Sequence, residues 1–371
     1  MKRLALAAVA FTLAATPAHA ETRTFTVTTR DGAPINGQAD LPSAPARTTI
    51  IFVAGTGMFD RDASFGRSNT PRDLIFADLA QRMNARGLAT VRYDRRGLRY
   101  GATGAERIDA ALASAATNET QVNDLAAVYA WAQARDGLNA RCVIFFGHSE
   151  GMAHIGRLAD TGARRPLAVI GMGALLESPR SVFHWQRTGR DAHSLRMMDT
   201  DGDGRTTNEE VQANFMRTPS GVWETVAPFL SPSGAWTAAD IEALPSRQET
   251  LLYAPERAQI LAQADDAPFP SAQTPMASYA WIKSFFTDET PIAQRLARWD
   301  APMIFHYGSY DSQTVAARQE AAAAPIAGRA RFTLHANRGH SLGEHPLFGP
   351  IDETLADQIA AEAAEAARGC R

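Results

Sequence analysis

The chain lacks the features that mark a small cross-linked protein or a membrane protein. Only two of its 371 residues are cysteine, too few for a disulfide framework. Beyond the first twenty residues there is no second long apolar run, so no transmembrane helix is expected. The formal net charge of −3 at pH 7 does not favour a nucleic-acid partner. No internal repeat or low-complexity tract stands out, which leaves a globular enzyme as the default class.

The first twenty residues have the pattern of a secretory signal. Two basic residues precede an apolar run over residues 4–15, and residues 18–20 form an A-x-A cleavage site. The apolar run is too short to span a bilayer, which argues against a membrane anchor. We therefore expect an exported protein, periplasmic or secreted, with residues 1–20 as a signal peptide and no stable membrane anchor.

The two cysteines lie far apart in the sequence. Cys142 opens a predicted strand, and Cys370 ends a predicted C-terminal helix. Antiparallel packing of that helix on the sheet would bring both to the same edge, and disulfides persist in an exported protein. The residues leave two outcomes open: one disulfide, or a buried core thiol and a frayed terminal thiol.

Strands that alternate with helices predict an α/β fold with a mostly parallel, twisted sheet flanked by helices. Three β-rich stretches come first and are interpreted as an antiparallel lead-in: residues 24–29, 35–41 and 48–53. The alternating elements that follow are helix 73–86, strand 88–93, helix 122–135, strand 142–146, helix 152–160 and strand 167–170. The pattern resumes with strand 303–307, helix 314–323, strand 330–335 and helix 351–368.

The interruption between these two series predicts a helical cap insertion over residues 172–300, which is 300 − 172 + 1 = 129 residues without strand alternation. The core would then comprise a first part, residues 21–171, and a second part, residues 301–371. We expect the insertion to cover the sheet.

The motif Gly147-His148-Ser149-Glu150-Gly151 follows an apolar strand directly and precedes a helix. A G-x-S-x-G sequence in that setting is a nucleophile elbow, in which a sharp turn exposes the serine at the carboxyl end of the strand. The glycines are needed because the turn leaves no room for side chains. The pattern therefore predicts Ser149 as a nucleophile.

A serine nucleophile needs a base, and the base needs a group that orients it. Asp311 follows the strand at residues 303–307, and His340 follows the strand that ends at His335. Both therefore fall on loops at the same sheet edge as Ser149, which predicts the triad Ser149, His340 and Asp311.

Other residues compete for two of these roles. Glu177 is a reserve for the acid, and His335 and His345 are alternatives for the base. His335 is expected inside a strand, and His345 comes late, before a proline. The remaining histidines are expected to be packing or surface residues: His148, His154, His184, His193 and His306.

The oxyanion of a tetrahedral intermediate needs backbone donors. One is expected to be the N–H of Glu150, the residue after the nucleophile, and the other the N–H of Thr56 in the Gly55-Thr56-Gly57 loop after the third strand.

Several motifs together resemble the bacterial esterase and serine-aminopeptidase-like branch of the α/β-hydrolase superfamily. They are Gly55-Thr56-Gly57 with Asp60-Arg61-Asp62, then Arg92-Tyr93-Asp94-Arg95-Arg96-Gly97, the elbow, Asp311-x-Gln313-x-Val315 and Gly339-His340. The resemblance covers nearly all of the chain except the insertion. It implies an α/β-hydrolase fold and catalytic roles for Ser149, Asp311 and His340.

Residues 199–210 fit the D-x-D-x-D-G-x₅-E pattern of an EF-hand calcium loop. Thr206 stands where such loops usually carry an aliphatic residue that pairs with a second loop, and the sequence reveals no second loop. We therefore expect one structural Ca²⁺ site and no organic cofactor. The expected ligands are the carboxylates of Asp199, Asp201, Asp203 and Glu210, the carbonyl of Arg205, and Thr207 directly or through water.

These observations predict an exported serine hydrolase that cleaves a small-molecule carboxylic ester. An aminopeptidase or amidase would use the same residues, and only the leaving group would differ. A non-catalytic, calcium-dependent binding module is the alternative from another class.

Overall fold

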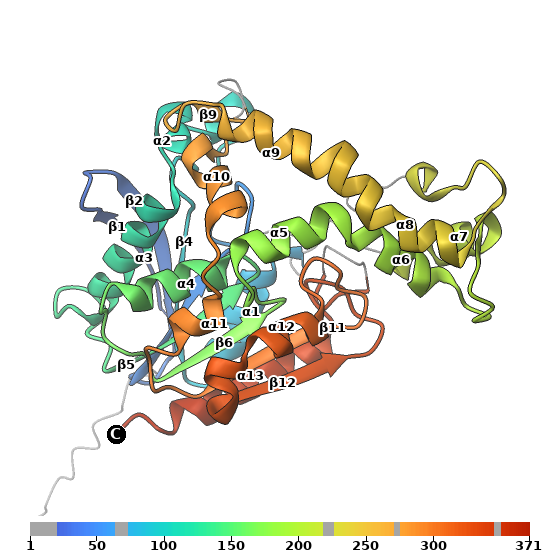
Figure 1. Cartoon of the computed structure of the whole chain (residues 1–371). Helices are drawn as coiled ribbons and strands as arrows, with labels where there is room; N and C mark the ends of the chain where they lie inside the picture. The colour runs from blue at the N-terminus through green and yellow to red at the C-terminus, as the bar shows by residue number, and fades with distance from the viewer. Residues whose placement is uncertain (1–20, 64–72, 218–225, 271–274, 345–349) are drawn as a thin grey trace, which may run out of the picture.

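The structure is a computed structural model that describes residues 21–63, 73–217, 226–270, 275–344 and 350–371 (Figure 1). The signal at residues 1–20 and His345 therefore lie outside the described residues. Within the described ranges, no helix has both the length and the apolar character to cross a bilayer.

The described residues form a central sheet of eight strands in the order β1-β2-β4-β3-β5-β6-β11-β12. Its strands are β1 (Glu21–Thr28), β2 (Pro34–Leu41), β3 (Thr48–Val53), β4 (Ala89–Tyr93), β5 (Cys142–His148), β6 (Ala168–Met172), β11 (Met303–Gly308) and β12 (Ala330–His335). β1 and β2 are antiparallel to their neighbours, whereas all pairs from β4 to β12 are parallel. The predicted mostly parallel sheet is confirmed. The lead-in prediction was wrong for β3, which lies between β4 and β5 in the parallel part because its apolar side chains are buried on both faces.

Helices cover both faces of the sheet. One face carries α1 (Ile75–Asn84) and α13 (Glu353–Ala367), and the other carries α3 (Asn118–Gln133), α4 (Gly151–Asp160) and α11 (Ile292–Leu296). β5 supplies both cores in alternation: Val143 and Phe145 pack on the α3–α4 side, Ile144 and Phe146 on the α1–α13 side. This alternation follows from the two-residue period of a strand. Two further helices are α2 (Ala110–Ser114) and α12 (Ala316–Ala322).

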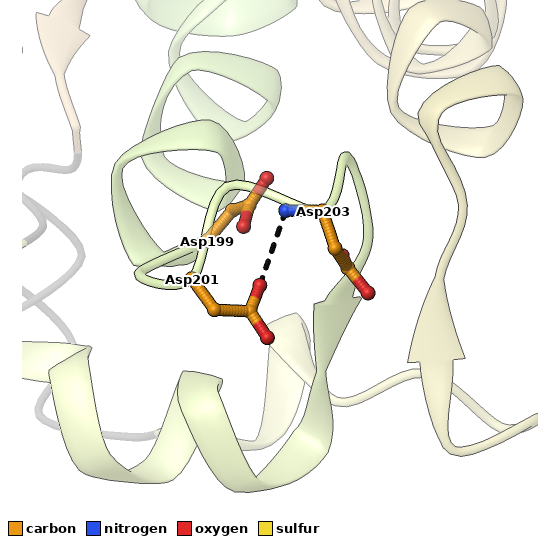
Figure 2. Close-up of side chains that lie close together, drawn as sticks. All are labelled: Asp199, Asp201 and Asp203. Atoms are coloured by element: carbon orange, nitrogen blue, oxygen red, sulfur yellow. Dashed lines mark hydrogen bonds between the residues drawn. The ribbon is translucent and has the colours of Figure 1, made fainter.

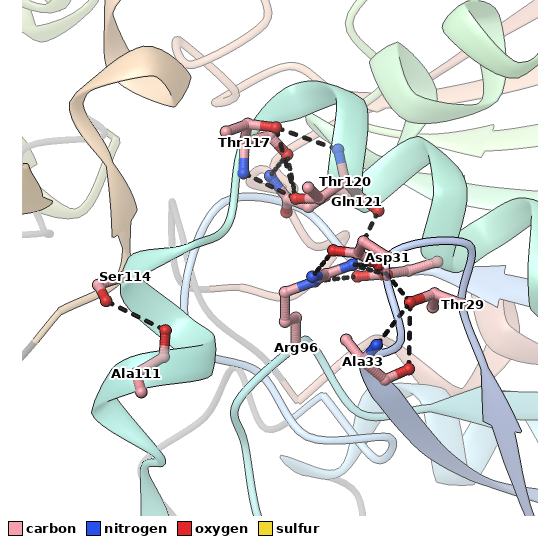
Figure 3. Close-up of polar contacts among 10 residues, drawn as sticks. Thr29, Asp31, Ala33, Arg96, Ala111, Ser114, Thr117, Thr120 and Gln121 are labelled. Carbon is pink, nitrogen blue, oxygen red and sulfur yellow. Dashed lines mark hydrogen bonds and ion pairs between the residues drawn. The ribbon is translucent and has the colours of Figure 1, made fainter. Parts of the chain in front are cut away.

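A buried arginine joins three distant segments at the β1–β2 end of the sheet. Arg96, just after β4, pairs with Asp31 in the β1–β2 turn, as Figure 3 shows, and also with Asp124 on α3. Thr29 donates to Asp31 from within the same turn. Burial raises the pKa of Asp124 to about 6, although its bonds to Arg96 act in the opposite direction. The contact fixes the direction in which the chain leaves β4.

The described residues between β6 and β11 are mainly helical and correspond to the expected cap. Its helices are α5 (Pro179–Thr188), α6 (Arg190–Met198), α7 (Asn208–Asn214), α8 (Ala238–Gln248), α9 (Ala254–Leu261) and α10 (Tyr279–Thr287). It also has two small antiparallel pairs, β7 (Thr206–Thr207) with β8 (Ala235–Trp236) and β9 (Pro268–Phe269) with β10 (Ala277–Ser278). In Figure 1, α5 and α10 lie next to the sheet while α6, α7 and α8 extend away from it.

The last part of the expected insertion, residues 172–300, packs on the sheet. Ile292, Leu296 and Trp299 belong to the core on the α3–α4 side of the sheet, and α11 packs on α4. The apolar surface of α11 therefore belongs to the sheet core rather than to the cap.

The structure joins Cys142 and Cys370 in a disulfide, with the two Cα atoms 5.9 Å apart. No described cysteine is left free. Of the two outcomes that the sequence left open, the structure has the bridge. It links the start of β5 to the short segment that follows α13, across a sequence separation of 228 residues.

Because this bridge closes a long loop, we expect Cys370→Ser to lower the free energy of unfolding by about 2–5 kcal/mol. Urea unfolding of the oxidised mature chain and of the variant measures the difference. Reduction of the unsubstituted chain is the control and should lower stability by a similar amount. Equal stability of the oxidised and reduced chains would contradict the structural role of the bridge.

Candidate active site

The turn between β5 and α4 holds Ser149 in a left-handed backbone conformation, with φ of 53°. This conformation is costly for a residue with a side chain and occurs mainly where the surroundings enforce it. A Cβ on Gly151 would lie 2.1 Å from the carbonyl oxygen of Val53, and a Cβ on Gly147 would lie 2.8 Å from Ile155. Close packing on backbone therefore requires Gly151, whereas a Cβ on Gly147 would mainly meet the movable side-chain ends of Ile155 and Met152.

The structure brings His340 and Asp311 together. His340 Nδ1 lies 2.8 Å from Asp311 Oδ2, and both side chains are buried. The Asp311 carboxylate also accepts the backbone N–H groups of Gln313 and Thr314, at 2.8 and 3.0 Å. With Nδ1–H donated to Asp311, the Nε2 atom of His340 is the imidazole nitrogen left as an acceptor.

Thr314 is a third member of this cluster that the sequence prediction missed. Its hydroxyl lies 2.8 Å from Asp311 Oδ2, 3.0 Å from the carbonyl oxygen of Gly173 and 3.4 Å from His340 Nδ1. A threonine three residues after an aspartate is a common backbone-turn spacing, so the signal was present but not specific.

The competing acid lies in another network. Glu177 pairs with Arg318 and accepts hydrogen bonds from Gln319 and Ser181, at 2.7 and 2.6 Å. Its carboxylate holds the start of α5 against α12 and makes no hydrogen bond or ion pair with His340 in the part of the chain that the structure describes. The geometry therefore favours Asp311 over Glu177 as the orienting acid.

The competing base His335 pairs with another histidine. Its Nε2 lies 3.0 Å from Nδ1 of His306, and burial lowers the pKa of His335 to about 4. His335 ends β12 and forms no part of the pocket that contains Ser149. His345 lies outside the described residues.

His148 was expected to be a packing or surface residue, and it lies at the site. Its ring is buried 4.8 Å from the ring of His340, edge to face, and it lines the same pocket. Burial holds the pKa of His148 well below its ordinary value of 6.5, and the nearby His340 acts in the same direction. His148 is therefore a neutral wall beside His340 at neutral pH.

The two predicted oxyanion residues face each other. Thr56 and Glu150 both line the pocket, and the Thr56 hydroxyl donates to Glu150 Oε2 at 2.7 Å. A Cβ on Gly55 would lie 2.8 Å from Cβ of Ser149, so the loop after β3 approaches the nucleophile closely because Gly55 has no side chain.

Glu150 is also where the cap meets the elbow. The indole Nε1 of Trp281, on α10, donates to Glu150 Oε1 at 2.6 Å, and both residues are 2% exposed. Burial acts to raise the pKa of Glu150, but His154, Arg95 and the bonds from Thr56 and Trp281 together lower it. The carboxylate is therefore ionised at neutral pH and fixes the position of α10 over the elbow.

One pocket of about 310 Å³ contains Ser149 and His340. The elbow and the loops at the strand ends form its floor, and the cap forms its walls through α5, the start of α6 and α10. The cap residues of the lining are Val182, Phe183, Gln186, Arg187, Arg190, Trp281, Ile282 and Phe285. Their roles were missed because a helical spacing in an insertion predicts a buried face without saying what it faces.

Comparison with solved structures identifies the architecture. The protein DcsB, solved with a substrate analogue, is similar with a TM-score of 0.54 and 14% identity over 95% of this chain and 100% of that chain. The α/β hydrolase GrgF from Penicillium sp. sh18 matches with a TM-score of 0.51 and 15% identity, covering 94% and 99%.

The chain has the α/β-hydrolase fold. A thermophilic esterase from Thermogutta terrifontis shares this hydrolase fold, with a TM-score of 0.50 and 16% identity over 93% of this chain and 99% of that chain. No protein-family model and no curated protein matches the sequence. At these identities the likeness shows the fold alone.

The candidate calcium loop lies in the cap, beyond the C-terminal end of α6. Carboxylate oxygens of Asp199, Asp201 and Asp203 lie within 4.8 Å of one another (Figure 2), and loop amides hold them. The structure does not bring Glu210 into this group. Its carboxylate accepts the N–H groups of Thr200 and Thr207, at 2.9 Å each, at the base of the loop.

The structure corrects the expectation that this loop is alone. Thr206 pairs with Trp236 in the antiparallel β7–β8 pair, so a second loop lies beside the first. Each loop has a glycine with positive φ two residues before its paired residue: Gly204 before Thr206, and Gly234 before Trp236.

Each of the two loops also leads into a helix whose first turn has a capping box, Thr207 with Glu210 and Thr237 with Asp240. At the positions that correspond to Asp199, Asp201 and Asp203, the second loop has Phe229, Ser231 and Ser233. The absence of carboxylates hid it from motif analysis.

The bond between Trp281 and Glu150 gives a stability prediction. Trp281→Phe removes a donor to a buried carboxylate, whereas Trp299→Phe removes a donor to the neutral carbonyl of Ala163 at equal burial. Hydrogen bonds to charged groups contribute more, so we expect Trp281→Phe to cost about 1 kcal/mol more than the matched variant in urea unfolding at neutral pH.

The pH dependence of this difference has a defined sign. The folded pKa of Glu150 lies below its ordinary value of 4.5, so the extra stabilisation is present above that value and is lost as the pH falls through the folded pKa. A difference between the two variants that does not change on acidification would contradict the assignment.

Proposed function

We propose that this protein is an exported serine hydrolase that cleaves carboxylic esters. The observation that carries the proposal is that one pocket contains both a strained, positive-φ Ser149 at the carboxyl end of β5 and a buried His340 that is hydrogen-bonded to Asp311. The neighbouring loop residues Thr56 and Glu150 supply the backbone region in which oxyanion donors belong in this fold. The esterases and hydrolases among the similar structures support the same reaction class.

The residues define a mechanism of acyl transfer to water. Nε2 of His340 takes the proton from the Ser149 hydroxyl as its Oγ attacks the ester carbonyl, and Asp311 stabilises the imidazolium that forms. The N–H groups of Thr56 and Glu150 hold the oxyanion. His340 then gives the proton to the leaving alcohol, and a water molecule, activated in the same way, releases the acid and restores Ser149.

Two alternatives share the observations. An aminopeptidase or amidase would use the same triad with an amine as leaving group. A calcium-dependent binding module would keep the fold without turnover, but the hydrogen bond from His340 to Asp311, with Ser149 in the same pocket as His340, argues against a site that has lost catalysis. The largely apolar walls of the pocket favour an ester with an apolar portion over a peptide.

Calcium binding by residues 199–210 belongs to this proposal as a structural element. Asp199, Asp201 and Asp203 fit a divalent cation, and Arg205, Thr207 and Glu210 would complete the ligand set. The loop follows α6 directly, and α6 begins at the pocket residue Arg190. A bound cation would therefore neutralise the loop and stabilise the cap wall, without a role in the chemical step.

Ser149→Ala should abolish hydrolysis of p-nitrophenyl butyrate by the mature chain. Asp311→Asn should lower kcat by about 10⁴-fold, because the amide no longer orients His340 in the required tautomer. The matched control is Glu177→Gln, which should retain activity within about tenfold, since Glu177 contacts Arg318 rather than His340. A larger loss of kcat in Glu177→Gln than in Asp311→Asn would assign the orienting role to Glu177 instead of Asp311. Turnover of an anilide substrate without turnover of the ester would favour the amidase.

Calcium should raise the unfolding temperature of the mature chain, and EDTA should reverse the effect. Asp201→Asn should remove most of this shift, whereas Asp240→Asn in the second loop should leave it unchanged because the other carboxylate positions there are occupied by Phe229, Ser231 and Ser233. Calorimetry in calcium-free buffer gives the affinity. No heat of binding, together with an unchanged unfolding temperature, would refute the calcium site.

A further inference from the structure

The pocket above Ser149 contains one arginine whose charge is only loosely paired. Arg190 begins α6 and lines the pocket, and its Nε is buried without a hydrogen-bond partner among the described residues. Asp191 Oδ1 forms an ion pair with this Nε at 3.8 Å, which is longer than a hydrogen bond. Asp191 is engaged elsewhere, because Gln248 donates to its other oxygen at 2.6 Å.

The neighbouring arginine at this wall has its charge paired by a carboxylate. Arg187 lines the same pocket one turn earlier, and its guanidinium donates twice to Glu256 on α9, at 2.7 and 2.9 Å. Its charge is therefore compensated within the cap. Burial lowers the pKa of Arg190 from its ordinary value, as expected for a cation that water reaches poorly.

A second donor in the pocket lacks a partner. Gln313 follows the triad aspartate by two residues and lines the pocket, and its side-chain Nε2 is buried with no hydrogen-bond partner among the described residues. Its backbone carbonyl accepts from Gln186 Nε2 at 3.0 Å, which ties α5 to this loop. Buried donors of this kind are normally satisfied, so the two donors at this wall would gain from an acceptor that a ligand supplies.

The one carboxylate among the lining residues does not serve these donors. Glu150 accepts from Thr56 and Trp281 at the elbow, and Arg95 lies close enough to affect its pKa. The exposed surface of the pocket is mainly apolar, although polar side chains also line it. The pocket thus presents an apolar surface with a single poorly compensated positive charge at the α5–α6 junction.

We propose that the substrate is an ester that carries a free carboxylate, bound by Arg190 with Gln313 as an additional donor. The proposal rests on the ester hydrolysis proposed above and names its substrate class. A guanidinium can bind a carboxylate through two parallel hydrogen bonds, and a site with unpaired donors rejects a neutral analogue that leaves them unsatisfied. The apolar walls would contact the chain between the ester and the carboxylate.

The test compares esters that differ only in this group. Monomethyl adipate is matched with methyl hexanoate for a carboxylate on the acyl side, and 6-acetoxyhexanoate with hexyl acetate for one on the alcohol side. We expect the mature chain to favour the charged member of at least one pair by at least about tenfold in kcat/KM. Arg190→Gln should lower this preference by at least about tenfold, and Arg190→Lys should retain part of it.

Arg180→Gln is the control, since Arg180 lies on α5 outside the pocket and pairs with Glu289 at the surface. It should keep the preference of the unsubstituted chain. Turnover of both neutral and charged esters at equal kcat/KM would overturn the carboxylate assignment while leaving the hydrolase in place. An equal preference in Arg190→Gln and Arg180→Gln would overturn the role of Arg190.

A binding measurement tests the carboxylate site independently of turnover. Adipate and suberate are titrated calorimetrically into the Ser149→Ala protein, with and without Arg190→Gln, after circular dichroism has shown that both are folded. We expect binding that Arg190→Gln weakens by at least about tenfold. Binding without turnover of any ester by the active chain would refute the hydrolase and keep the carboxylate site. No binding, with no preference for charged esters, would refute the carboxylate site.

Discussion

The active-site geometry depends on the backbone of Ser149, which is held at positive φ between a buried strand and a buried helix. Such a conformation persists only where the surroundings leave no alternative. Here Gly151 packs on the β3 backbone and Gly55 packs on Ser149 itself, so the elbow, β3 and the oxyanion loop fit together as one unit. The same contact brings Thr56 within hydrogen-bond distance of Glu150.

Buried arginines at the end of β4 hold neighbouring segments beside this unit. Arg92 and Arg96 pair with aspartates from other segments, and Arg95 between them donates to the carbonyl of Gly57 at 2.8 Å, in the oxyanion loop. A buried ion pair contributes little net stability but is costly to break, so these pairs favour one path for the chain after β4. Arg190 differs from them because its ion pair with the adjacent Asp191 is long, at 3.8 Å, and because it lines the pocket.

The cap is stabilised at two places, one near the sheet and one farther out. Near the sheet, α10 is fixed to the elbow through Trp281 and Glu150, so the pocket wall and the nucleophile turn are directly bonded. Farther out, two loops pair through β7 and β8 over a small core of their own that includes Leu195 and Phe229. Helix α6 connects these regions, because it begins at the pocket and ends at the acidic loop. Helix α6 therefore links the pocket wall directly to the acidic loop.

The sequence by itself determined the features that rest on local chemistry. The elbow follows from glycines beside Ser149, and the parallel sheet follows from alternating elements, which places Asp311 and His340 at one edge. Non-local contacts were decided only by the tertiary structure: Asp311 rather than Glu177 beside His340, the pairing of Cys142 with Cys370, and the unmarked second loop. The physical reason is that a turn is specified by adjacent residues, whereas a partner across the fold depends on how whole elements pack.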